Sequence, residues 1–280
     1  LNNLKDSLKK NKLIFSERII NSFHTSLKIN DISPITVLAG VSGTGKTLLP
    51  INYAKAMGLH HLVVSVQPRW DSPQDLFGFY NYLERKYIAT DLARTLIRMD
   101  SYNSHQLDVA NEGENRSDRM LLVLLDEMNL ARVEYYFSEF LSKLELRSDV
   151  KNKNDPSKRS DAEIVLETGP RSDNKKQYRI WVGGNVIFVG TMNEDESTQT
   201  LSDKVIDRAN VLRFGKPPDG INPALDNNST SQENDNPQEE YLPYSVWKSW
   251  IKQLSGDNIW DNDVDKWIIS INNAECVNEN

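Results

Sequence analysis

Four uninterrupted apolar runs of strand length are spaced along the chain. They are ITVLAG (35–40), HLVVSV (61–66), MLLVLLDE (120–127) and NVIFVGTMN (185–193). Helical spacing of apolar positions follows the first run at 47–58 and the third at 133–147. Strands that are apolar throughout and alternate with helices predict an α/β fold. We expect a three-layer sandwich whose central parallel sheet is covered on both faces.

The stretches around these runs predict how the chain is organised. Residues 67–81 have loop-like composition, and a charged insertion precedes two hairpin-like arms at 163–168 and 178–184. Polar, proline-containing text then separates the core from two amphipathic segments, 244–254 and 263–271. We therefore expect four parts: an N-terminal helical linker (1–30), the α/β core (31–216, with the insertion and hairpin at about 148–184), a linker (217–240) and a helical lid, complete or truncated (241–280).

Composition and charge narrow the class of protein. The 280 residues carry a net charge of −7, which argues against a protein that coats DNA by charge alone. The single Cys276 cannot form an internal disulfide and fits a reducing cytoplasm. No apolar run is long enough to cross a bilayer, so we expect a cytoplasmic protein with no membrane partner. A first residue of Leu rather than Met suggests a fragment of a longer protein.

The motif GVSGTGKT (40–47) fits the phosphate-loop pattern and lies between a predicted strand and a predicted helix. Its glycines let the backbone curl, so that N–H groups and the helix N-terminus face a phosphate. Lys46 would reach the outer phosphates, and the hydroxyl of Thr47 would bind Mg²⁺. The predicted nucleotide-binding residues are Gly40, Val41, Ser42, Gly43, Thr44, Gly45, Lys46, Thr47 and Leu48.

A second motif, LLVLLDEMN (121–129), ends an apolar strand with two acids. Downstream of a phosphate loop, this is the pattern by which such proteins hold a metal and activate water. Asp126 would bind Mg²⁺ through water, and Glu127 would act as general base on the attacking water. The paired acids favour hydrolysis over the chemistry of a small-molecule kinase.

A third motif, IFVGTMNEDEST (187–198), carries one amide and three acids at the end of the fourth strand. If this strand lies between the first and the third, Asn193 comes beside the γ-phosphate. Its amide could hold water because it donates and accepts hydrogen bonds at once. Glu194, Asp195 and Glu196 cannot all lie near a triphosphate, so most of them would face solvent or a partner's cation.

These three motifs, in this order, resemble the AAA+ family of ring-forming NTPases. GVSGTGKT is similar to its Walker A motif, LLVLLDE to its Walker B motif, and Asn193 to its sensor 1. The hairpin-like text at 163–184 is similar to the pre-sensor hairpin of the branch that includes MoxR-type ATPases, dynein, midasin and McrB. The resemblance spans roughly residues 35–214 and implies Mg²⁺ as cofactor and GTP or ATP as substrate.

Two stretches resemble McrB, the GTPase of modification-dependent restriction. DEMNLARVEYY is close to its Asp-Glu-Ile-Asn-Arg-Ala text, and MNEDEST resembles its signature Met-Asn-Thr-Ala-Asp-Arg-Ser. Counted from Asn193, the signature acid falls on Glu196; a slip of one residue would place it on Asp195. Both therefore remain candidate catalytic acids. No sequence motif indicates recognition of a guanine base, so the choice between GTP and ATP stays open.

The resemblance also implies catalytic arginines that act on a neighbouring subunit. Arg208, after Ile206-Asp207, best matches the arginine finger, and Arg213 is the alternative. The competing interpretation is a surface salt bridge of Arg208 with Asp203 or Asp207. Arg132 is a further candidate for a contact in trans. No Arg follows Arg213, where many AAA+ lids supply a sensor 2 arginine. Three alternatives stay open: a Lys takes its place, the lid extends past Asn280, or this branch does without the residue.

Together these observations predict a Mg²⁺-dependent NTPase that works as a homo-oligomeric ring, expected to be a hexamer. The McrB resemblance implies a motor of a DNA restriction or defence system, with a nuclease subunit or domain elsewhere and DNA bound through missing segments. One alternative is a MoxR- or midasin-like ATPase that remodels protein complexes. Another is a non-hydrolysing module that binds nucleotide only to assemble.

Overall fold

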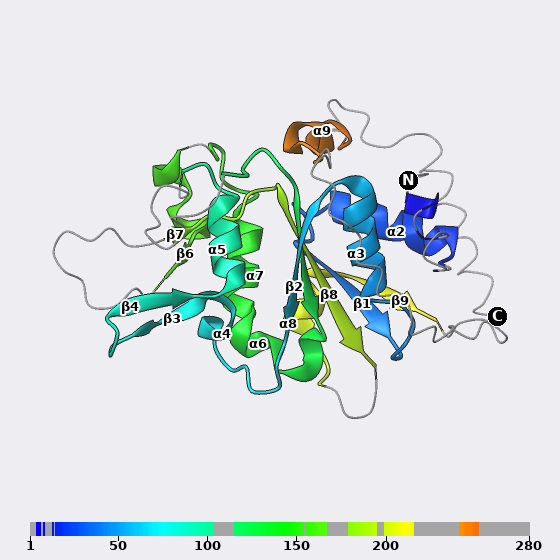
Figure 1. Cartoon of the computed structure of the whole chain (residues 1–280), viewed down its shortest axis with the longest axis horizontal. Coiled ribbons are helices and arrows are strands. Elements are labelled where there is room, and N and C mark those ends of the chain that lie inside the picture. Colours follow the sequence, from blue (N-terminus) through cyan, green and yellow to red (C-terminus); the bar gives the residue numbers. More distant parts are fainter. Residues whose placement is uncertain are drawn as a thin grey trace, which may run out of the picture. The chain divides into compact units, whose positions relative to one another are not determined.

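A computed structural model describes the chain at residues 4–6, 8, 13, 15–102, 115–153, 155–166, 179–194, 199–215 and 241–251 (Figure 1). The chain divides into two compact units, Leu1–Val246 and Trp247–Asn280. Only 247–251 of the second unit belong to the described ranges. The predicted linker at 217–240 and the predicted helix at 263–271 lie outside them. The fold below is that of the first unit.

A five-stranded, all-parallel sheet forms the centre of this unit, in the order β2-β5-β8-β1-β9. The strands are β1 (Ile35–Gly40), β2 (His60–Ser65), β5 (Leu121–Asp126), β8 (Val186–Asn193) and β9 (Ala209–Phe214). The predicted α/β class is confirmed. β8 lies between β1 and β5, which is the arrangement that the interpretation of Asn193 requires.

Helices cover both faces of the sheet (Figure 1). One face carries α2 (Glu17–Lys28) and α3 (Leu48–Met57). The other carries α4 (Pro73–Phe77), α5 (Asp91–Arg98), α6 (Val133–Tyr136) and α7 (Ser138–Leu146). Side chains alternate between the faces of a strand, so cover on both sides requires apolar residues at successive positions. Every residue of β1 is buried, which accounts for its uninterrupted apolar run.

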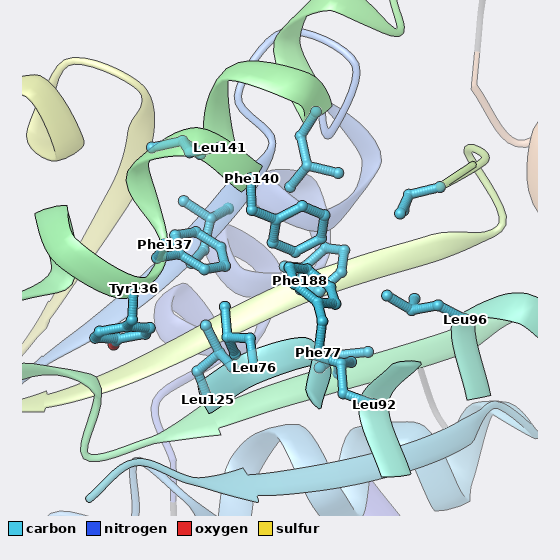
Figure 2. Close-up of a cluster of buried hydrophobic side chains, with 14 of the residues drawn as sticks. Leu76, Phe77, Leu92, Leu96, Leu125, Tyr136, Phe137, Phe140, Leu141 and Phe188 are labelled. Atoms are coloured by element: carbon cyan, nitrogen blue, oxygen red, sulfur yellow. The ribbon is translucent and has the colours of Figure 1, made fainter. Parts of the chain in front are cut away.

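The core between the sheet and α4–α7 is built around an aromatic cluster (Figure 2). The Phe140 ring meets Phe77, Phe137 and Phe188 edge-on, with ring centroids 5.1–5.2 Å apart. Edge-to-face packing brings the positive edge of one ring to the negative face of the next. Phe188 belongs to β8, so the cluster fixes α7 against the strand that carries Asn193.

Two predicted segments differ from the structure. The helix expected at 133–147 is divided into α6 and α7 at Phe137, whose φ of −120° leaves the helical range while its ring stays buried in the core. The loop expected at 67–81 holds α4 and β3 (Gly78–Asn81), which pairs with β4 (Lys86–Ala89) in an antiparallel hairpin. Core packing in the first case and long-range pairing in the second outweigh local composition.

The described ranges include part of the predicted insertion and of each predicted hairpin arm. Within the described residues of the arms, β6 (Ile164–Val165) pairs antiparallel with β7 (Arg179–Ile180). The insertion forms two 3₁₀ turns, η3 (Pro156–Lys158) and η4 (Ser160–Ala162). Between them Arg159 is buried, and it donates to Asp100 at 2.7 Å and to Glu163 at 2.9 Å. This buried ion-pair network fastens the insertion to the end of α5.

Three further short elements lie in the described ranges. These are the 3₁₀ turn η2 (Met128–Leu130) after β5, α8 (Asp203–Ile206) before β9, and α9 (Tyr244–Ser249). α9 falls within the helix predicted at 244–254. Across the described ranges, no helix is long and apolar enough to span a membrane.

Truncating the central ring should destabilise the fold strongly. We expect Phe140→Ala to lower the free energy of unfolding by about 3–5 kcal/mol, because it removes a buried ring and leaves a cavity. The matched control is Phe79→Ala on β3, where the side chain is 49% exposed and the change should stay within about 0.5 kcal/mol. Urea unfolding followed by circular dichroism measures both. Equal losses would contradict the assigned core.

The contact between α2 and α3 should make stability depend on pH. His24 Nδ1 lies 2.7 Å from the hydroxyl of Tyr53, and burial, followed by repulsion from Lys28, lowers the pKa of His24 to about 4. The unfolded chain, with a His pKa near 6.5, binds the proton more readily. Stability is therefore full above pH 6.5 and falls as the pH drops towards 4.

Replacing the histidine tests this dependence. His24→Gln should flatten the fall in unfolding free energy between pH 6.5 and 4.5, while His61→Gln, at an exposed position of β2, should change that fall far less. Part of the dependence of the unfolding free energy on pH should remain, since burial also lowers the pKa of His60 to about 4. An unaltered slope in His24→Gln would refute the assignment.

Candidate active site

The phosphate-loop motif forms a tight loop between the end of β1 and the start of α3. Gly43 and Gly45 adopt φ angles of 80° and 85°, in the left-handed region that favours glycine. A Cβ on Gly45 would also come within 2.9 Å of the Phe15 ring. The loop delivers the chain into α3 at Leu48, so its backbone curls around the positive end of a ten-residue helix.

Lys46 is folded back into this loop. Its side chain is buried, and Nζ donates to the carbonyl oxygens of Gly40 at 2.9 Å and Val41 at 2.6 Å. The ammonium group is thus held where the loop would surround a phosphate. An incoming phosphate oxygen could take over these hydrogen bonds with little movement of the side chain.

Asp126, at the end of β5, joins the loop to the neighbouring strand. Its Oδ1 accepts hydrogen bonds from Thr47 Oγ1 and Thr191 Oγ1, both at 2.7 Å. Thr47 therefore uses its hydroxyl on Asp126 and makes no capping bond to α3. The predicted metal residues, Thr47 and Asp126, are in direct contact.

The oxygen donors of Thr47 and Asp126 suit Mg²⁺, which prefers hard ligands and keeps several waters. No cluster of three or more His, Cys, Asp or Glu side chains that could hold a metal alone occurs in the described ranges. A cation held by one carboxylate, one hydroxyl and the phosphates of a substrate fits this donor set. These residues are therefore compatible with the predicted Mg²⁺ site.

Glu127 and Asn193 lie close together at the ends of the neighbouring strands β5 and β8. Asn193 Nδ2 donates to Glu127 Oε1 at 3.4 Å. Glu127 adopts a φ of 54°, a strained conformation for a residue with a side chain, and its N–H donates to Thr191 Oγ1 at 2.8 Å. The site thus places a carboxylate acceptor beside an amide, the two groups predicted to hold an attacking water.

The acids after Asn193 are only partly described. Glu194 forms an ion pair with Arg213 at 3.5 Å, where the Arg213 side chain is 78% exposed. Arg213 lies level with Ala39 in β1, at the same edge of the sheet as the phosphate loop. Asp195 and Glu196 lie outside the described residues, so both remain predicted candidates for the signature acid.

Arg208 lies at the other end of β9. It pairs with Glu145 at 3.1 Å and donates to Ser142 at 3.0 Å, both on α7. The competing interpretation named Asp203 or Asp207 as the ion-pair partner of Arg208. The partner in the structure is Glu145, because Arg208, directly before β9, lies against α7. At about 3.3 Å per residue, the length of β9 puts Arg208 about 15–20 Å from its own phosphate loop.

Arg132, the other arginine predicted to act in trans, lies at the start of α6. It donates to the Tyr135 hydroxyl at 3.1 Å and lies over that ring at 5.7 Å. Tyr135 is 52% exposed, so the pair lies on the surface of the chain. Its role towards a neighbour stays a prediction.

Sequence reasoning missed two residues of this site, Thr191 and Asn129. Thr191 is a polar residue within a buried strand and shares a strand face with Asn193, two positions later. Asn129 follows the acid pair and is 1% exposed. A hydrogen-bonding residue in an otherwise apolar setting was the available signal in both cases.

Comparisons with known proteins leave the family open. No family profile matches the chain, and no curated protein matches it. Among solved structures, the chain is similar to a provisionally named ATPase from Cytophaga hutchinsonii, with a TM-score of 0.38 and 18% identity over 76% of this chain and 51% of the other. The chain thus spans about half the length of that protein, and so distant a likeness does not identify an activity.

The hydroxyl of Thr191 should be important for the stability of the site. Thr191→Val keeps the shape but leaves the Glu127 N–H and one Asp126 oxygen without this partner, so we expect the free energy of unfolding to fall by about 1–3 kcal/mol. Thr191→Ser retains the hydroxyl and should lose about 0.8 kcal/mol, for one methyl group. Chemical denaturation of both variants tests the assignment. A Val variant as stable as the Ser variant would contradict it.

Proposed function

We propose that this chain is an Mg²⁺-dependent nucleoside triphosphatase of the AAA+ type. The observation that carries the proposal is the meeting of four groups at one edge of the sheet. Lys46 and Thr47 follow β1, Glu127 follows β5, and Asn193 ends β8. Acids alone at a strand end are common. Here two of the groups belong to the phosphate loop, and Glu127 and Asn193 lie at the ends of two neighbouring strands.

In the proposed reaction, water attacks the γ-phosphorus of the nucleotide. A bond forms between the water oxygen and phosphorus, the bond to the β–γ bridging oxygen breaks, and the products are a nucleoside diphosphate and inorganic phosphate. Glu127 accepts the proton of the water, and the amide of Asn193 orients it. Lys46 and the loop N–H groups hold the phosphates. Mg²⁺ held at Thr47 and Asp126 would neutralise charge on the phosphate oxygens.

A ring assembly forms part of this proposal. Arg208 lies too far from the phosphate loop of its own chain to act there, so a role on the transferring phosphoryl group requires a neighbouring copy. To serve as the finger it would leave Glu145 or share it, which makes hydrolysis depend on assembly. The number of subunits, predicted as six, rests on the family resemblance.

The nucleotide and the task of the motor follow from resemblance alone. A GTPase motor like McrB, acting with a nuclease on DNA, is our first proposal. An ATPase like MoxR or midasin, acting on protein complexes, is the second. The intact set of Lys46, Asp126, Glu127 and Asn193 argues against a module that only binds nucleotide, since such a module has no need of a water-activating pair.

Removing the proposed base tests the function directly. Glu127→Gln should lower turnover of the preferred nucleotide by about 100-fold or more, while the Kd for that nucleotide stays within about threefold, because the phosphate loop is unchanged. The matched control is Glu139→Gln, at an exposed position of α7, which should hydrolyse like the wild type. Phosphate release with GTP and with ATP, at several protein concentrations, gives the measurement.

The outcomes separate the candidates. GTP turnover that rises with assembly favours the McrB-like motor, and ATP turnover favours the remodelling ATPase. A wild-type protein that assembles and binds nucleotide without turnover, even with DNA or candidate partners present, would overturn the proposed hydrolysis.

A further inference from the structure

A buried amide, Asn129, holds the end of the strand that carries Asn193. Asn129 lies in η2, directly after Glu127 and Met128, and is 1% exposed. Its Nδ2 donates to the carbonyl oxygens of Asn193 at 2.8 Å and Gln199 at 3.1 Å. Its Oδ1 accepts from the N–H of Asn193 at 3.3 Å. Both ends of one amide therefore bind the backbone of one residue.

This side chain continues the sheet beyond the point where a strand stops. The β5–β8 pairing ends at Leu125 opposite Gly190, whereas β8 continues to Asn193 on its β1 side. From Thr191 to Asn193, no described strand pairs with the β5 side of β8. The amide of Asn129 has the same donor and acceptor as a peptide group, and it pairs with Asn193 as the next residue of a strand would.

The loop that presents Asn129 is itself fixed. The hydroxyl of Tyr136 donates to the carbonyl oxygen of Met128 at 2.7 Å, and Tyr136 is fully buried. On the other side, the N–H of Glu127 is bound by Thr191. Glu127 and Asn129 thus lie on one rigid turn, so the hydrogen bonds of Asn129 set the position of Asn193 relative to the carboxylate of Glu127.

We propose that Asn129 is a positioning residue for hydrolysis, which holds the Asn193 amide at the distance from Glu127 where the two share the attacking water. The proposal rests on the proposed function. Asn129 does not reach the reacting atoms; it acts through the backbone of Asn193. Loss of its hydrogen bonds would free the strand end, and misplacement by about 1 Å can cost a factor of about 100 in rate.

The chain offers a matched control on the same strand. Asn185, directly before β8, is also a buried asparagine, and its Nδ2 donates to the carbonyl oxygens of Met99 at 3.0 Å and Ser117 at 3.2 Å. It lies at the edge of the sheet away from the phosphate loop. Asn129→Ala and Asn185→Ala remove similar buried hydrogen bonds, but only the first touches the site.

The experiment compares kcat and nucleotide affinity in the two variants and the wild type, at a temperature where circular dichroism finds all three folded. We expect Asn129→Ala to lower kcat about 10- to 100-fold, with the Kd for a fluorescent nucleotide analogue within about threefold. In Asn185→Ala, kcat and the Kd for the analogue should both stay at their wild-type values. If Asn129→Ala does not fold, Asn129→Asp keeps the shape, loses the donor and should show the same selective loss of kcat.

The possible results distinguish a failure of the positioning role from a failure of the proposed function. Two results would overturn the positioning role and leave the proposed function standing. One is turnover at the wild-type rate in the Asn129 variants. The other is a loss of turnover in Asn185→Ala equal to that in Asn129→Ala. A loss of nucleotide affinity as large as the loss of kcat would also overturn it, since a general disturbance of the site would then explain the data. Absence of turnover in the wild type would overturn the proposed function and this inference with it.

Discussion

Asp126 accepts hydrogen bonds from two threonines, and the rest of the candidate site depends on this shared carboxylate oxygen. Thr47 belongs to the loop after β1, and Thr191 belongs to β8. The two bonds therefore join the ends of three adjacent strands at one edge of the sheet. A parallel sheet brings strand ends together, but only side-chain bonds of this kind fix the loops that leave them.

The site also holds backbone strain that its surroundings compensate. Glu127 adopts a left-handed conformation, which costs on the order of 1–3 kcal/mol for a residue with a side chain. Its N–H is bound by Thr191, and its carbonyl oxygen accepts from Leu130. The turn moves the Glu127 side chain out of line with β5 and towards Asn193. Strain of this kind persists only where several contacts determine the same geometry.

Much of this arrangement could be predicted from the sequence, because the strongest patterns coincide with the most buried strands. β1, β5 and β8 are covered on both faces and read as uninterrupted apolar runs, and the motifs follow their ends. β9 was missed because it is an edge strand of mostly intermediate burial, and ANVLRF mixes polar and apolar residues. The partners of Asn129 and Arg208 were missed because both depend on residues about 65 positions away.

The sheet order also bears on how the protein is made. β1, which leads into the phosphate loop, has β8 and β9 as its two strand neighbours, and these are the last strands of the sheet to be synthesised. β2 and β5 emerge earlier but do not touch it. On the ribosome, the apolar β1 must therefore wait without a partner strand until Asn193, the last residue of β8, has left the exit tunnel. During that interval it is an exposed aggregation-prone segment and a natural binding site for a chaperone.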